Sequence, residues 1–152
     1  MSLSHHLLSV LVRWAHVVAM ASILGGAILV WGMSLRSQSR LLARGIADLA
    51  QTYEWIFWAA IGVAVMTGVG NLGAFGDRLP GAQTRWGTTF SVKLLLVLAL
   101  AFLSIPRTLI VATLEAGDQV PPAERRLFLS LYATSTLVVV AVLGTAVFLA
   151  HG

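Results

Sequence analysis

Long stretches without a single charged residue constrain this chain more than any other feature of its sequence. Two of them run from Trp55 to Phe75 and from Leu127 to Ala150. Each exceeds the roughly 20 apolar residues that an α-helix needs to cross a hydrocarbon core about 30 Å thick. Only 11% of the residues are charged, whereas a typical soluble domain carries about 25%. The sequence therefore predicts an integral membrane protein.

Hydropathy divides the chain into four apolar segments, separated by short connections with turn chemistry such as Gly76-Asp77 and Pro121-Pro122. We expect spans at about 7–35, 53–75, 88–110 and 127–150, within a single transmembrane domain of residues 1–152. Continuous apolar runs are typical of membrane helices, whereas the residues of a barrel strand alternate between apolar and polar. The predicted fold class is therefore all-α, an integral membrane four-helix bundle.

The distribution of basic residues predicts how this bundle is oriented. Of the ten Lys and Arg residues, six lie around the first and third loops and four lie at the opposite ends of the spans. Because basic loops stay on the cytoplasmic side, we expect both termini on the outer (periplasmic) side of a bacterial inner membrane. The six are Arg36, Arg40, Arg44, Arg107, Arg125 and Arg126, and the four are Arg13, Arg78, Arg85 and Lys93.

Several function classes have no support in the sequence. The net charge is only +4 and the basic residues are scattered over short loops, so we expect no nucleic-acid partner despite a pI of about 10.7. The chain contains no cysteine, which excludes thiolate metal sites and thiol redox chemistry. Gly68, Gly70 and Gly73 do not follow a strand, so they do not form a dinucleotide motif. We assign no catalytic residue and favour a protein that is not an enzyme.

Ionisable residues inside membrane spans are costly, so each is a candidate functional residue. The sequence places Arg13, His16, Glu54 and Lys93 within or at the edge of the spans, with His151 after the last one. We expect Glu54 and Arg13 to reach the headgroups from the span ends. His16 lies deeper, roughly 13 Å into the first span at 1.5 Å per residue.

His16 is the centre of a possible copper site. Met20 follows it by four residues and shares its helix face, and Met66 is expected at a similar depth in the second span. An imidazole with one or two thioethers suits a soft ion such as Cu(I). His5 and His6, with His151, would capture the ion at the outer face.

Two other interpretations of these residues stay open. Lys93 enters the third span from the same outer side, so His16 and Lys93 are candidates for holding a haem iron from two helices. Alternatively, His16 hydrogen-bonds a neighbouring helix, Lys93 extends to the outer surface and the Met residues fill the core. In that case the protein is a non-catalytic membrane subunit.

Short motifs spread over nearly the whole chain resemble the copper resistance D (CopD)-like membrane family. They are Arg13-Trp14-Ala15-His16, Gly25-Gly26, Met66-Thr67-Gly68, the segment from Val92 to Leu98 and the segment from Arg125 to Thr145. The resemblance implies an inner-membrane helical bundle linked to copper uptake or tolerance. A first-span His and a third-span Lys are also similar to the HemJ-type protoporphyrinogen oxidases, which implies haem b near His16 and Lys93.

The chain departs from the HemJ-type pattern at two places. The residues after His16 read Ser22-Ile23-Leu24-Gly25-Gly26, and those after Lys93 read Leu103-Ser104-Ile105-Pro106-Arg107. We therefore expect a CopD-like protein that handles copper through His16, Met20 and Met66, with haem b at His16 and Lys93 as the alternative. Apart from the lipid bilayer, the expected partners are a second copy of the chain or a larger membrane complex.

Overall fold

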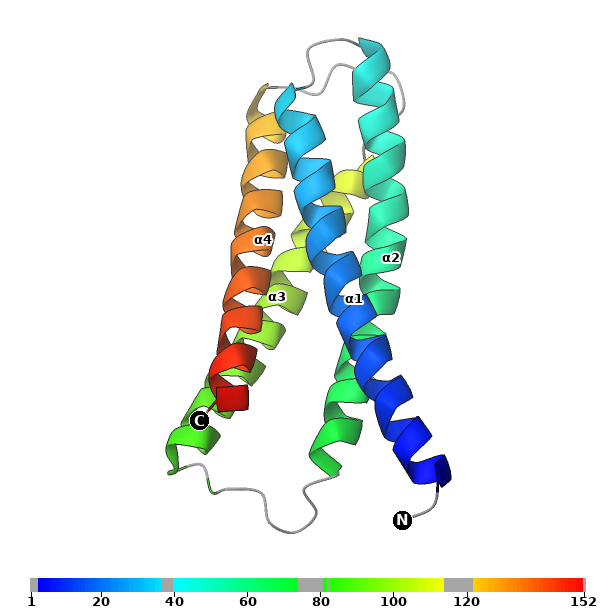
Figure 1. The fold of residues 1–152 in the computed structure, drawn as a ribbon. Coiled ribbons are helices and arrows are strands. Elements are labelled where there is room, and N and C mark those ends of the chain that lie inside the picture. Colours follow the sequence, from blue (N-terminus) through cyan, green and yellow to red (C-terminus); the bar gives the residue numbers. More distant parts are fainter. Residues whose placement is uncertain (1–2, 37–39, 74–80, 82, 114–121, 152) are drawn as a thin grey trace.

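The computed structural model is all-helical in the residues it describes, which are 3–36, 40–73, 81, 83–113 and 122–151. It contains α1 (Leu3–Arg36), α2 (Arg40–Gly73), α3 (Arg85–Thr113) and α4 (Pro122–His151), which run up and down in one bundle (Figure 1). The predicted all-α class is confirmed.

Each helix contains a stretch that is long and apolar enough to cross a membrane. These stretches are His6–Arg36, Gly45–Val69, Arg85–Thr113 and Ala123–Leu149. The shortest has 25 residues, or roughly 37 Å of helix at 1.5 Å per residue, which exceeds a hydrocarbon core about 30 Å thick. The chain is therefore a multi-pass membrane protein, as its uncharged stretches predict.

The helix bounds differ from the predicted spans mainly in α2. The second span is predicted to begin at residue 53, whereas the helix begins at Arg40 and its apolar stretch at Gly45. Asp48 lowers the local hydropathy, but Ile46 and Ala50 of the same turns are buried in the bundle. Tertiary packing therefore extends the helix beyond the apolar run. Residues 74–75 of the predicted span lie outside the described residues.

The start of α3 has a local cause, and a proline lies inside the helix near its other end. Thr84 precedes the helix, and its Oγ1 accepts a hydrogen bond of 3.0 Å from the backbone N–H of Gly87, which is the geometry of an N-cap. Toward the other end, α3 continues through Pro106 to Thr113. Proline has no N–H to donate to the carbonyl of Phe102, so α3 lacks one backbone hydrogen bond there.

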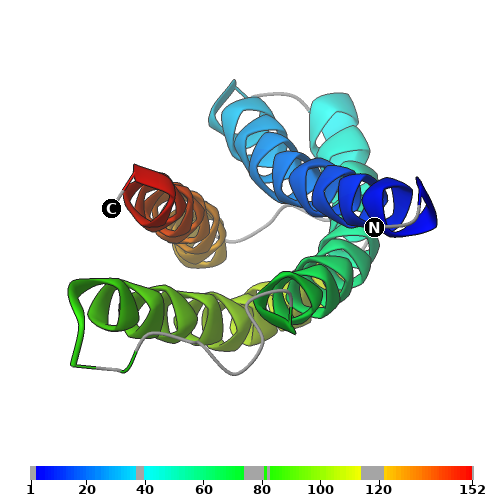
Figure 2. The same ribbon diagram turned by 60° about the horizontal axis from the view of Figure 1, so that its bottom comes forward.

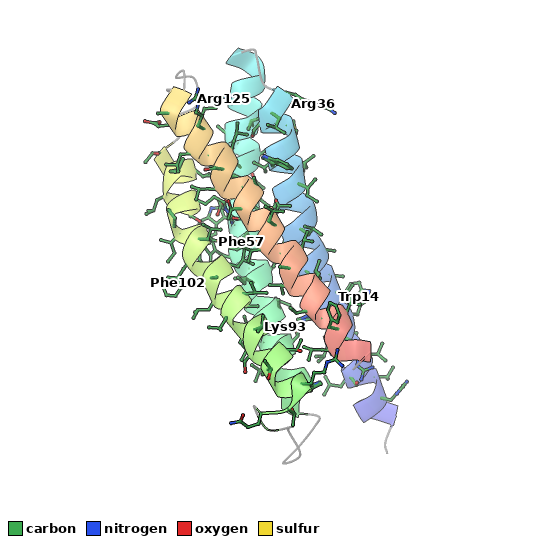
Figure 3. The ribbon with its side chains drawn as sticks, turned by 90° about the vertical axis from the view of Figure 1, so that its left-hand side faces the viewer. Trp14, Arg36, Phe57, Lys93, Phe102 and Arg125 are labelled. Carbon is green, nitrogen blue, oxygen red and sulfur yellow. The ribbon has the colours of Figure 1, made fainter. Side chains whose placement is uncertain are left out.

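The bundle consists of two helical hairpins. α1 packs along α2, α3 packs along α4, and the contact between α2 and α3 is the smallest of the four main helix contacts. We call the end where α1 and α3 finish the basic end, because it carries Arg36 and Arg125 (Figure 3). We call the opposite end, where α1 begins and α4 finishes, the terminal end.

Small residues let the helices approach closely. Ala19 of α1 and Ala60 and Ala64 of α2 are buried, and Ala60 and Ala64 lie four residues apart on one face of α2. Many large apolar side chains lie on the outside: Trp55 is 83% exposed and Phe148 is 73% exposed. This distribution suits a bundle whose surroundings are lipid tails.

Burial is unequal along the bundle. Among the described side chains, none is buried before Ala19 in α1, after Ala64 in α2, between Gly87 and Leu100 in α3, or after Val142 in α4. These four limits all lie toward the terminal end. There α1 and α2 stand apart from α3 and α4 in both views (Figures 1 and 2). The core therefore occupies the basic half, and the terminal half is loosely packed.

Candidate functional site

His16 lies on α1 in the terminal half and is bound to α2 through its ring. Its Nδ1 is 2.9 Å from Oγ1 of Thr67. The Thr67 hydroxyl donates its single hydrogen to the carbonyl of Val63 at 2.6 Å, with the Ala64 carbonyl at 3.2 Å. With its hydrogen directed to a backbone carbonyl, the Thr67 oxygen is available to accept from the ring, which corresponds to the tautomer with the proton on Nδ1. In that tautomer Nε2 keeps its lone pair, which is the form of imidazole that binds a metal.

The residue of α2 beside Cε1 of this ring is a glycine, Gly68. A Cβ built on Gly68 would lie 3.9 Å from Cε1 of His16, so Gly68 lies beside the ring and adds no side chain there. His16 itself is half-buried. An oriented ring with a free nitrogen in a loosely packed region can act as a ligand without first breaking its bond to Thr67.

Lys93 lies on α3 in the same half of the bundle, together with Trp14 of α1 (Figure 3). Its side chain is half-buried, as that of His16 is. The structure therefore places His16 and Lys93, one from each hairpin, in the same region of the bundle.

Lys93 has no acidic partner among the side chains that the structure describes. Glu54 pairs with Arg107, and Asp48 and Glu124 are exposed near the starts of α2 and α4, at the basic end. A cation in a membrane span is unfavourable unless it is paired or reaches the interface. Among the described residues, Lys93 is therefore a candidate to pair with a ligand that brings negative charge.

The other predicted ligands are less well placed. Met20 is half-buried against the core, on the same face of α1 as His16. Met66 is 77% exposed on the outer surface of α2, and His6 is exposed. The side chains of His5 and His151 lie outside the described part of the chain. No group of three or more His, Asp or Glu side chains suited to a metal ion occurs among the residues described.

A second polar cluster, in the basic half, is fully buried. Arg107 is 0% exposed and Glu54 is 4% exposed. The guanidinium donates from Nε to Oε1 of Glu54 at 2.7 Å and from Nη2 to Oε2 at 3.1 Å. Such a two-point pair is the strongest geometry available to these groups. We call Glu54, Arg107 and their partners Thr108 and Tyr132 the ionic cluster.

Hydroxyl groups from two helices complete the coordination of the carboxylate. Thr108 of α3 donates to Oε2 of Glu54 at 2.6 Å, and Tyr132 of α4 donates to Oε1 at 2.8 Å. Trp58 of α2 donates in turn from Nε1 to Oγ1 of Thr108 at 3.0 Å. A buried charge is tolerable only when it is paired and hydrogen-bonded, and the Glu54 carboxylate meets both conditions.

Three aromatic rings surround the guanidinium of Arg107. Its Cζ lies 4.2 Å from the ring centre of Phe57, 5.1 Å from that of Tyr132 and 5.4 Å from that of Tyr53. Nη1 is buried without a hydrogen-bond partner, and the ring faces provide cation–π attraction in place of an acceptor. Tyr53 also donates to the carbonyl of Ile23 at 2.8 Å. The cluster and its rings therefore involve all four helices.

This cluster corrects two expectations from the sequence. Glu54 does not reach the headgroups and Arg107 does not lie in a loop, because α2 begins well before Glu54 and α3 continues past Pro106. One signal in the sequence pointed to the cluster. Leu100, Ser104, Arg107 and Val111 follow a helical spacing, and all four are buried on one face of α3.

Comparisons with protein-family models, with curated proteins and with solved structures find no match to this chain. Its function is therefore argued from the geometry of its own residues.

Proposed function

We propose that the protein is a membrane haem b protein, in which Nε2 of His16 would hold the iron. The observation that carries this proposal is the hydrogen bond of 2.9 Å between Nδ1 of His16 and Oγ1 of Thr67, because it orients the ring and engages Nδ1 rather than Nε2. Ligating histidines in general donate their other ring N–H to a neighbouring acceptor. Haem b supplies one-electron redox chemistry when bound.

Lys93 supports haem b over a bare metal cation. Haem b is negatively charged, because its two propionates outweigh the charge of the iron–porphyrin core. The Lys93 ammonium near His16 therefore attracts haem b, whereas it repels a copper ion. Lys93 serves in this proposal as the counter-charge to a propionate or, as the neutral amine, as the second ligand.

The basic residues support an orientation for this site. Without Arg107, which is buried in the bundle, the basic end still carries the larger share of the Lys and Arg residues near the helix ends. Under the positive-inside rule this end is cytoplasmic. The proposed location is a bacterial inner membrane with His16 in its outer half.

The absorption spectrum of the purified protein tests the proposal. Titration with haemin in detergent is expected to give a Soret band that saturates at one haem per chain. The His16→Ala variant should lose the band, because the axial ligand is gone. The matched control is His6→Ala, which removes an exposed imidazole from the same helix and should leave the spectrum unchanged. A His16→Ala spectrum identical to that of the unmodified protein would refute the assignment.

Thr67→Val tests the role of the hydroxyl that holds the ring. Losing such a supporting hydrogen bond usually weakens a metal site by about 10- to 100-fold, so haem should dissociate more readily. Thr67→Ser keeps the acceptor and is expected to keep the affinity within about twofold. Equal affinity in Thr67→Val and Thr67→Ser would show that the bond does not prepare the ligand.

Copper handling is the second candidate, and Met20 is the observation that favours it. Its thioether lies one turn from His16 on the same face of α1 and is half-buried. One equivalent of Cu(I) without a Soret band, lost in Met20→Leu but kept in the exposed Met66→Leu, would establish this candidate. Co-purification with a larger membrane assembly, without bound haem or Cu(I), would favour the third candidate, a non-catalytic subunit.

A further inference from the structure

The two hairpins are joined by packing of α1 against α4 and by polar bonds in the basic half. Glu54 of the first hairpin accepts hydrogen bonds from Arg107, Thr108 and Tyr132 of the second. Nearer the basic end, Nη2 of Arg125 donates to the carbonyl of Ser34 at 3.0 Å. Apart from these bonds, the contact between α2 and α3 is small. The ionic cluster is therefore the main attachment of α2 to α3.

The distribution of buried side chains also differs between the basic half and the terminal half. At the basic end, buried side chains continue to Ser34 in α1 and to Val111 in α3, close to where these helices finish. At the terminal end, the last buried side chain of α4 is Val142, and no described side chain of α1 before Ala19 is buried. The asymmetry is therefore a property of packing and does not come from helix ends in general.

Separating the hairpins has a different cost at the two ends. In the basic half, separation would leave Glu54 and Arg107 as unpaired charges in an apolar environment, which is strongly unfavourable. In the terminal half, separation replaces contacts between apolar side chains by contacts with lipid tails. Since lipid tails are as apolar as those side chains, no hydrophobic force opposes this exchange.

We propose that the ionic cluster is a pivot, which holds the two hairpins together in the basic half and lets them move apart in the terminal half. The motion changes the distance between the first hairpin (α1 and α2) and the second hairpin (α3 and α4) in the half that contains His16 and Lys93. Ligands therefore reach these two residues from the terminal end. This inference concerns the helices alone and holds whether the ligand is haem, copper or neither.

Spin-label distances in lipid nanodiscs test the pivot. The chain contains no cysteine, so pairs of introduced cysteines carry the only labels. Val69→Cys with Val92→Cys reports on α2 and α3 in the terminal half, and Thr52→Cys with Ala112→Cys reports on the same helices in the basic half. All four positions are exposed. We expect the terminal distance distribution to be at least twice as broad as the basic one.

Two further measurements complete the test. Tyr132→Phe removes one bond of the ionic cluster, keeps the ring, and is expected to broaden the basic distribution. Equal widths at the two ends in the unmodified protein, or a broader distribution at the basic end, would overturn the pivot. Haemin should narrow the terminal distribution alone. If haemin has no effect while the widths differ as expected, the haem assignment fails and the pivot stands.

Discussion

Replacing Arg107 by alanine is expected to lower the free energy of unfolding by about 3–5 kcal/mol, the usual cost of breaking a buried ion pair from one side. The substitution leaves the Glu54 carboxylate buried, with Thr108 and Tyr132 as its remaining donors. It also removes the cation that fills the space between three aromatic rings. Reversible unfolding in detergent or bicelles measures the loss.

Two comparisons make this prediction specific to the ion pair. Arg126→Ala removes an exposed arginine from α4 and should change stability by less than about 0.5 kcal/mol, as surface substitutions usually do. The double variant Glu54→Leu with Arg107→Leu removes both charges and should be more stable than Arg107→Ala, because no charge stays unpaired. If Arg107→Ala is as stable as Arg126→Ala, the pair does not hold the bundle together.

Replacing Gly26 by alanine is the second substitution expected to have a large effect. A Cβ at this position would overlap Cδ2 and Cε2 of Tyr53. The Tyr53 ring cannot move freely, because its hydroxyl donates to the Ile23 carbonyl and its ring packs against Tyr132. Overpacking of this kind costs about 1–3 kcal/mol, and losing the hydrogen bond adds about 1 kcal/mol. We expect a total loss of at least about 2 kcal/mol.

The neighbouring glycine is a matched control. A Cβ on Gly25 would meet no atom within 4 Å, so Gly25→Ala adds a methyl group without a clash. Alanine is favoured over glycine in a helix by up to about 1 kcal/mol, so this variant should be as stable as the unmodified protein or slightly more so. Gly26→Ala and Gly25→Ala are therefore expected to change the free energy of unfolding in opposite directions or by clearly different amounts. Equal stabilities in thermal unfolding would contradict it.

Part of the candidate site can be predicted from the sequence. A histidine well inside an apolar run and a lysine in another are conspicuous, because charged and polar side chains are costly there. The structure brings His16 and Lys93 into the same region of the bundle. Thr67 was not singled out as a partner for the imidazole, because a threonine inside a helix usually bonds its own backbone. Its contact with His16 depends on how α1 and α2 are rotated.

The ionic cluster could not be predicted in this way. Glu54 and Arg107 lie 53 positions apart in the chain and each lies close to the end of an apolar stretch. At such positions a long side chain has two options, because it can extend to the headgroups or turn toward the bundle. Hydropathy does not distinguish them.

The amino-acid sequence by itself determined the class of this protein: four apolar helices, because a chain with so few charges can satisfy its backbone in lipid only through helices or a closed barrel. It also identified His16 and Lys93 as ionisable residues within those helices, whereas Arg107 was expected around a loop. Only the tertiary structure decided their partners, since the rotation of each helix and the continuation of α2 and α3 beyond the apolar runs place Glu54 against Arg107 and His16 against Thr67. Because lipid tails are as apolar as the core side chains, hydropathy does not mark which face of each helix is buried, and this is the physical reason for the difference.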